Sequence, residues 1–420
     1  MAQQEWSHAA ASRYRPDGRI GTPFHTRTAR TSATPWYFNW DLHHVVDVYD
    51  DFYAELRAIR ETVAMGDMSP LSKCEISGPD ATAVVDRLIT RDAHALAVGS
   101  IYYTPWCNDD GKVIVAGLVF RTGESAYRFS GDRSLAWFTQ QAEGHDVSVV
   151  DVTDDFGVLT VQGPNSRQVL ERATGRDWSD LDFSRLEHAE IAGVEVEVAR
   201  QGFTGELGYE IFTPFRGAAA VWDAVADAGD GLFMRPCGEW AIDVARVEAG
   251  LLIAGPDYAN AGPDPVGSHT VSASEPEFMS SPFELGIGRF VDFYKGDFIG
   301  REALLREQEV GGPKRALVGL DIDWRQVVAE HVDRGIAPNV SSRVEWIAKP
   351  VRDGAAPVGR ASSITWAPTI GKLIGFGHLD REAAGIGARV AVDWGIAGSG
   401  ESAGIAATVA ELPFLQLRRR

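Results

Sequence analysis

The sequence is poor in cysteine, and this excludes a fold held together by disulfide bonds. Its three cysteines, Cys74, Cys107 and Cys237, lie far apart and lack the spacing of a metal site. No uninterrupted apolar stretch reaches the ~18 residues that a membrane-spanning helix requires. The first residues, MAQQEWSHAA, lack the basic region and apolar run of a secretory signal. We therefore expect a cytoplasmic protein that does not contact a membrane.

Basic residues and several well-known motifs are also in short supply. The chain has 40 Lys and Arg against 59 Asp and Glu, so its formal net charge is −19. Such a surface repels nucleic acid and anionic lipid, and we expect neither as a partner. The sequence has no GxxxxGK[ST] loop, no GxGxxG after a strand and no GxSxG elbow. We accordingly expect no nucleotide loop, no serine-hydrolase site, no metal and no flavin.

What the sequence does contain predicts several α+β domains. A chain of 420 residues is too long for one ordinary core, so two or three domains are expected. Apolar spacing predicts a helix over 46–64, and Asp80 is expected to cap a second helix. Alternation predicts strands over the segments Ser72–Ser77, Val113–Phe120 and Tyr127–Ser130. These elements form a small α+β unit over about 65–145.

The second half of the chain changes character after Arg301. Before Arg301, the pattern predicts a strand over Gly157–Gln162 and a hairpin over Ile191–Val198 that turns at Ala192-Gly193. It also predicts helices over Ala218–Ala228 and Glu239–Leu251. The loop over 255–281 is long enough to be either an insertion or an active-site wall. After Arg301, short β-rich runs predict a small all-β domain: Ala316–Ile322, Leu373–His378, Arg389–Trp394 and Ile405–Leu412. We expect the boundary near 300–312.

One glycine-rich motif, Gly202 to Glu210, has two readings. Its glycines allow close backbone approach, and two carboxylates and two aromatics stand beside them. It is either a tight turn with solvated glutamates or a site for a flat, nitrogen-rich ring. In the second reading an aromatic covers the ring face and a carboxylate accepts hydrogen bonds from its edge.

Two other segments, 101–108 and 251–258, have less distinctive patterns. The aromatics of 101–108 are typical of a core, but they precede a polar turn at Asn108. Residues 251–258, which follow the predicted helix, are placed to face a cleft. On that helix, Arg246 and Glu248 are expected to form a structural ion pair.

Five segments together resemble the aminomethyltransferase (glycine-cleavage T-protein) family, and they occur in the family's order. They are Gly66–Ala81, Val161–Pro164, Gly202–Ile211, Arg246–Leu251 and Lys295–Leu304. The resemblance implies an α+β, three-domain T-protein-like fold around a central folate site. It implies a discontinuous folate-binding domain (1–64 and 146–300), a ferredoxin-like domain (65–145) and a C-terminal β-barrel or jelly-roll domain (301–420).

The resemblance also implies tetrahydrofolate as co-substrate and suggests where it binds. The glutamate that matches Glu210 binds the pterin ring in that family, and the aromatic matching Tyr102 or Tyr103 lies near the ring. Ser363–Pro368 resembles the segment that closes over the folate. We therefore expect the following cofactor-binding residues: Glu210, Tyr103, Phe203, Tyr102, Trp366 and Arg246.

One departure from the family pattern bears on the substrate. T-proteins usually carry an Asp-Asp pair, one of them catalytic, where this chain has Val115-Ala116, and an arginine where it has Ile242. A site for a cationic aminomethyl group is not expected to discard its carboxylate. The segments Pro282–Gly288 and Val390–Gly395 resemble those of bacterial relatives that demethylate substrates with tetrahydrofolate, above all aryl-ether O-demethylases. We expect the substrate pocket to include Trp36, Val115, Ala116, Ile242 and Tyr258.

These observations predict a tetrahydrofolate-dependent methyl or methylene transferase that acts on a small aromatic ether. Candidates for a catalytic donor or acid are Tyr37, His25, His43 and His44. The alternatives are an aminomethyltransferase with a lipoyl carrier, a demethylase of a sulfonium or methylamine compound, and a non-catalytic folate-binding protein. A flavin demethylase is a weaker alternative, because the chain lacks a dinucleotide-binding half.

Overall fold

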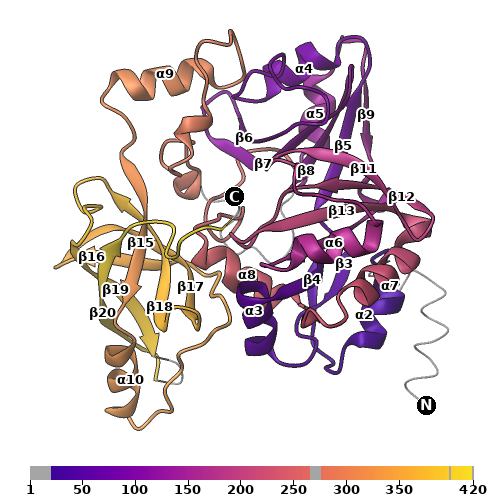
Figure 1. The fold of residues 1–420 in the computed structure, drawn as a ribbon. Helices are drawn as coiled ribbons and strands as arrows, with labels where there is room; N and C mark the ends of the chain where they lie inside the picture. The colour runs from indigo at the N-terminus through magenta and orange to yellow at the C-terminus, as the bar shows by residue number, and fades with distance from the viewer. Residues whose placement is uncertain (1–19, 265–275, 397–398, 419–420) are drawn as a thin grey trace.

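The computed structural model describes residues 20–264, 276–396 and 399–418, and its β-structure falls into four groups (Figure 1). A six-stranded sheet, a five-stranded sheet and a closed six-stranded barrel make up most of it. The fourth group is a three-stranded sheet near the N-terminus, formed by β1 (Ile20–Gly21), β2 (Tyr37–Trp40) and β3 (His43–Val46). None of the described helices is both long and apolar enough to cross a membrane.

The six-stranded sheet has the order β11-β12-β13-β10-β4-β14 and is covered by helices on both faces. Its strands are β4 (Val63–Asp67), β10 (Phe156–Gln162), β11 (Leu186–Ile191), β12 (Val194–Ala199), β13 (Gly208–Pro214) and β14 (Met234–Pro236). Ala64 and Val158 share a core with α3 (Phe52–Glu61) and α8 (Glu239–Glu248). Val63 and Leu159 face the other way, toward α6 (Ser166–Thr174) and α7 (Ala218–Ala228). The alternation of buried side chains thus creates two apolar layers on one sheet.

The five-stranded sheet has ferredoxin-like topology with one additional edge strand. Its strands are β5 (Ser72–Ser77), β6 (Ile101–Cys107), β7 (Val113–Gly123), β8 (Ala126–Gly131) and β9 (Ser148–Asp151), with α4 (Ala81–Leu88) and α5 (Leu135–Gln141) between them. The order β6-β7-β8-β5-β9 is antiparallel throughout. Without β6, the connection is β-α-β-β-α-β, which is the ferredoxin-like arrangement. Because β9 pairs with β5, this sheet continues past residue 145.

The C-terminal part is a closed antiparallel barrel with the order β15-β18-β17-β16-β19-β20. It comprises β15 (Arg315–Ile322), β16 (Lys349–Asp353), β17 (Ala356–Ala367), β18 (Lys372–Asp380), β19 (Arg389–Ile396) and β20 (Glu401–Ala410). Helix α9 (Arg301–Glu309) leads into the barrel, and α10 (Trp324–Val332) packs against its outside (Figure 1). Inward side chains such as Leu320, Val392 and Ile405 fill the core.

Several sequence predictions are confirmed. The strand Ser72–Ser77 and the helix Ala218–Ala228 have the predicted bounds. The hairpin of β11 and β12 turns at Ala192-Gly193, whose φ angles are 51° and 75°. Two successive positive φ angles give the type of turn that matches the twist of the flanking strands.

Other predictions differ from the structure at the ends of elements. The first predicted helix begins only at Phe52, because Asp51 caps it by accepting a bond from Ala54 N at 2.8 Å. Asp80 occupies the N-cap position of α4, but its carboxylate accepts a bond from Asp146 N instead. Helix α8 ends at Glu248, shortly before Gly250 with φ of 69°.

Candidate functional site

A cavity of about 750 Å³ lies where the two large sheets, helix α8 and the barrel meet. Its walls come from segments far apart in the sequence, including β2, β6, β7, β8, β13 and α8. The residues expected for folate or substrate that line it are Tyr103, Ala116, Phe203, Glu210, Ile242, Arg246 and Tyr258. The structure therefore brings together residues from five separate sequence segments.

Glu210 lies on β13 and directs a buried carboxylate to this cavity. Its side chain is 6% exposed, and no described residue donates a hydrogen bond to it. Burial raises its pKa to about 7, although the charge of Lys73 opposes the shift. Lys73 is itself buried and donates to the carbonyls of Ser69 and Leu71 at 2.8 and 2.6 Å. A buried carboxylate without a protein donor is costly, so the wall fits a ligand that brings its own N–H groups.

The glycine motif before Glu210 is a tight turn that wraps one side chain. A Cβ atom on Gly202 or Gly208 would lie 2.0 or 2.2 Å from Gln162 Oε1. The Gln162 amide donates to Thr160 Oγ1 at 2.8 Å and accepts from Thr204 Oγ1 at 3.0 Å. Positions 202 and 208 therefore require glycine because the Gln162 side chain lies so close to the backbone there. The end of the motif forms part of the cavity wall. The tight turn is confirmed, but its glutamates are not solvated, because Glu206 and Glu210 are both buried.

The two glutamates of the motif have different surroundings. Glu206 pairs with Arg60 at 3.1 Å, and Arg60 also pairs with Glu248 at 2.7 Å. All three side chains are buried. Glu206 therefore belongs to a structural ion-pair network, and Glu210 is the carboxylate of the motif that faces the cavity.

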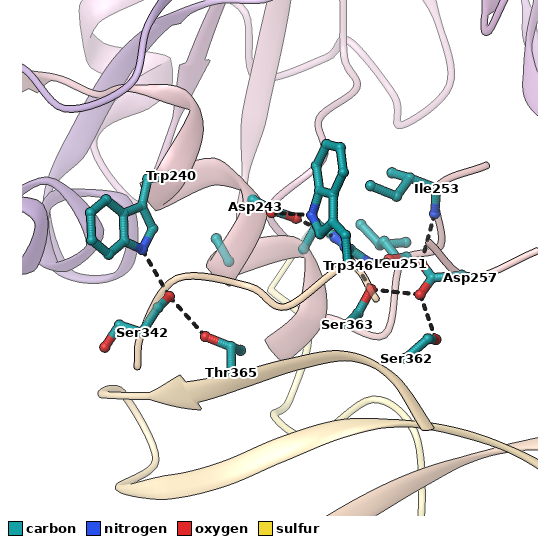
Figure 2. A network of polar contacts seen from close by, with 12 residues as sticks. Trp240, Asp243, Leu251, Ile253, Asp257, Ser342, Trp346, Ser362, Ser363 and Thr365 are labelled. Carbon is teal, nitrogen blue, oxygen red and sulfur yellow. Dashed lines mark hydrogen bonds and ion pairs between the residues drawn. The ribbon is translucent and has the colours of Figure 1, made fainter. Parts of the chain in front are cut away.

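Arg246 joins helix α8 to the barrel through a buried polar network. Figure 2 shows its partners Asp243, Asp257 and Ser363. It donates to Asp243 at 2.8 Å, to Asp257 at 2.7 Å and to Ser363 of β17 at 2.8 Å. Asp243 also accepts from Trp346 Nε1 at 2.9 Å. The expected ion pair between Arg246 and Glu248 is absent because each has other partners among the described residues. This network fixes the cavity wall, and a direct contact of Arg246 with folate stays a prediction.

Strand alternation decides which of two neighbouring residues faces the cavity. On β6, Tyr103 lines it, whereas Tyr102 lies beneath the Arg91 guanidinium at 3.5 Å. On β7, Ala116 lines it, whereas Val115 is 1% exposed in the core of the five-stranded sheet. Successive side chains of a strand point to opposite faces, so Tyr102 and Val115 lie away from the cavity.

Strand alternation also directs Tyr37 on β2 away from the cavity. On β2, Phe38 and Trp40 line it, while Tyr37 stacks on His44 with ring centroids 4.3 Å apart. His43 Nε2 lies 3.0 Å from Asp154. None of the four proposed catalytic donors, Tyr37, His25, His43 and His44, is among the lining residues.

Two tryptophans expected at the site also lie elsewhere. Trp36 is 55% exposed and stacks on Trp240 at 6.4 Å. Trp366 packs edge-on against Trp324 at 5.6 Å, beside the barrel core. The segment expected to close over folate contributes Ser363 to the Arg246 network instead.

From the aromatic segment 35–40, Phe38 and Trp40 line the cavity in place of the expected Trp36, and three other lining residues were not expected: Asp132, Glu239 and Trp346. The pKa of Asp132 is raised to about 6, mainly by burial and to a smaller extent by the negative charge of Asp41. The pKa of Glu239 is raised well above its usual value, mainly by burial and to a smaller extent by the negative charge of Asp243. The period-two pattern of β2 was a usable signal for Phe38 and Trp40. The others required knowledge of the tertiary fold.

Comparison with known proteins identifies the class to which this architecture belongs. The GCVT N-terminal domain model matches residues 26–264, and the glycine cleavage T-protein C-terminal barrel domain model matches 315–416. The chain is similar over 95% of its length to the crystal structure of aminomethyltransferase T of the glycine cleavage system from Bartonella henselae. The TM-score is 0.76, the identity is 20%, and 98% of that chain is covered.

Sequence relatives extend this result. The chain is 34% identical to a probable aminomethyltransferase of Halobacterium salinarum, over 94% of this chain and 98% of that protein. It is 32% identical to the aminomethyltransferase of Bacillus subtilis, over 81% and 85%. It is 36% identical to trimethylamine-oxide aldolase of Ruegeria pomeroyi over 80% of this chain, which corresponds to only 40% of that longer protein. The chain therefore belongs to the glycine-cleavage T-protein (aminomethyltransferase) family of folate-dependent one-carbon transferases.

Proposed function

We propose that this protein is a tetrahydrofolate-dependent demethylase that takes a methyl group from a small aromatic ether. The observation that carries the proposal is one cavity with two chemically different walls. One wall holds the buried, unpartnered carboxylate of Glu210, and another is formed by Phe38, Trp40 and Trp346. Its volume of about 750 Å³ is within the range for sites that bind small molecules and cofactors.

The folate end of the cavity is the end at Glu210. A pterin ring presents adjacent N–H donors along one edge, and an ionised carboxylate accepts two of them with charge-assisted bonds. Tyr103 and Phe203 line the same cavity and offer aromatic surface for the ring faces. Tetrahydrofolate supplies a nucleophilic nitrogen, N5, as the acceptor of the one-carbon unit.

The aromatic wall suits a flat substrate. Phe38 meets Trp40 and Trp346 edge to face, with centroids 6.4 and 5.6 Å apart. The Trp346 indole is held by its bond to Asp243. Rigid aromatic walls bury a ring with little loss of side-chain entropy and hold it against the second reactant.

Ala116 argues against an aminomethyl substrate. It lines the cavity at a position where the T-proteins that this chain resembles carry an acid, and it leaves apolar space there. This position therefore offers no carboxylate to a cationic amine intermediate, and burial raises the pKa of Asp132, the acid that lines the cavity nearby, to about 6. An ether needs no such partner before the methyl group leaves.

A methylated ammonium compound is the second candidate, and one observation favours it. The carboxylate of Glu239 lines the same cavity as the aromatic wall, and aromatic faces with an acid bind quaternary ammonium groups. The similarity to trimethylamine-oxide aldolase points the same way.

Incubation of the protein with tetrahydrofolate and a donor panel tests the proposal. The panel contains a methoxybenzoate, a methylenedioxybenzoate, a methylsulfonium, trimethylamine N-oxide and a trimethylammonium compound, and mass spectrometry detects methyl- and methylene-folate. We expect methyl-folate and a phenol from the methoxybenzoate. Product from the nitrogen compounds alone would favour the second candidate, and folate binding without turnover of any donor would favour a non-catalytic protein.

A further inference from the structure

Asp132 follows directly after the end of β8, close to Ala116 of the neighbouring strand β7. The pairing of β7 with β8 runs to Leu118↔Ser130, and β8 ends at Gly131. A Cβ atom on Gly131 would lie 3.5 Å from Gly117 Cα, so the strands stay in contact there. Both Ala116 and Asp132 line the cavity.

The Asp132 carboxylate is the acid beside Ala116 that no protein donor engages. Among the described residues none donates a hydrogen bond to it, whereas Asp41 pairs with Arg133 and Asp243 pairs with Arg246. The backbone N–H of Ala116 donates to Tyr258 Oη at 3.1 Å, and the charge of Asp132 acts on that phenol. Asp132 therefore stands with Ala116 and Tyr258 at one corner of the cavity.

Such a group is suited to donating a proton at physiological pH. Burial and the negative charge of Asp41 both favour its neutral form, because each penalises a carboxylate anion. A general acid works best when its pKa lies close to the working pH. The four donors expected from the sequence lie away from the cavity, so the reaction as proposed requires an acid from its lining.

We propose that Asp132 is the general acid that protonates the oxygen from which the methyl group departs. This inference rests on the proposed demethylation. The bond between the methyl carbon and the ether oxygen breaks as the carbon bonds to N5 of tetrahydrofolate, and the electron pair stays on oxygen. Asp132 gives its proton to that oxygen, so a neutral phenol leaves. The proton that N5 carried is then released and restores the acid, so no oxidant or reductant is consumed.

The test is the dependence of rate on the leaving group in Asp132→Asn and the wild type. The substrates are methoxybenzoates whose phenols span a wide range of acidity, together with an aryl dimethylsulfonium whose thioether leaves without a proton. General acid catalysis contributes ~10²- to 10⁴-fold, so kcat/KM for the least acidic phenol should fall by that factor in the variant. The loss should shrink as the phenol becomes more acidic and vanish with the sulfonium. Asp353→Asn, at an exposed position of the barrel, is the matched control.

Two results would overturn the role of Asp132 without touching the proposed function. One is an Asp132→Asn enzyme with wild-type rates on every ether. The other is an equal loss on all ethers and on the sulfonium, which indicates a structural defect. A wild type that turns over no ether, by contrast, would remove the proposed function and the role of Asp132 together.

Discussion

We expect that the ionised Glu210 carboxylate, which serves folate binding, lowers the free energy of unfolding of the folate-free protein. The pKa of its carboxyl rises from the usual 4.5 to about 7 in the folded state because the group is buried. Ionised Glu210 is therefore disfavoured by folding, and stability falls as pH rises from 4.5 through about 7. Since one pKa unit corresponds to about 1.4 kcal/mol, the penalty at pH 8 is about 3 kcal/mol.

Replacement of Glu210 by Gln removes this penalty and the charge-assisted bonds to the pterin. Denaturant unfolding should show the folate-free variant more stable than the wild type by up to about 3 kcal/mol at pH 8, and equal to it at pH 4.5. Titration calorimetry should show tetrahydrofolate affinity weakened by ~2–4 kcal/mol, or roughly 30- to 1,000-fold. Glu195→Gln, at an exposed position of β12, should change neither quantity. Unchanged folate affinity in Glu210→Gln would refute the reasoning.

Three further predictions follow from the walls of the cavity. Val115→Asp should lower the melting temperature sharply, because it buries a carboxylate in the sheet core, whereas Ala116→Asp should fold and impair ether demethylation more than folate binding; equal melting temperatures for the two variants would contradict their assignment to opposite faces. The purified protein should be colourless and free of stoichiometric metal, since the sequence carries neither a GxGxxG motif after a strand nor cysteines with metal-site spacing, and a visible flavin spectrum or elemental analysis showing metal would count against this. The wild type should release no ammonia from an aminomethyl-lipoyl carrier protein with tetrahydrofolate, and rapid ammonia release would restore the aminomethyltransferase alternative.

The sequence predicted individual elements more reliably than it predicted their faces. Strand Val113–Phe120 was recognised, and its alternation already implies that Val115 and Ala116 point in opposite directions. Which of the two meets the cavity depends on how the five-stranded sheet packs, and that is set by contacts distant in sequence. Tyr102 and Tyr103 present the same ambiguity.

The parts that sequence could not predict depend on long-range contacts. Arg246 bonds to Ser363, 117 positions along the chain, and nothing local to either residue indicates it. The barrel strand that holds Ser363 was missed because it is rich in serine and irregular. Its pairing shifts between Ser362 and Thr365, and Ser363 has φ of 48°. The nearness of Asp132 to Ala116 in the cavity lining likewise required the tertiary fold.

The most direct test of the account is to follow the methyl carbon itself. A methoxybenzoate labelled with ¹³C in its methyl group is incubated with the protein and tetrahydrofolate, and NMR follows the label while chromatography measures the phenol. We expect the label in 5-methyl-tetrahydrofolate, in a one-to-one ratio with the phenol, and no labelled formaldehyde. Label that stays in the ether, while a methylated amine or an aminomethyl carrier is turned over instead, would contradict the central claim.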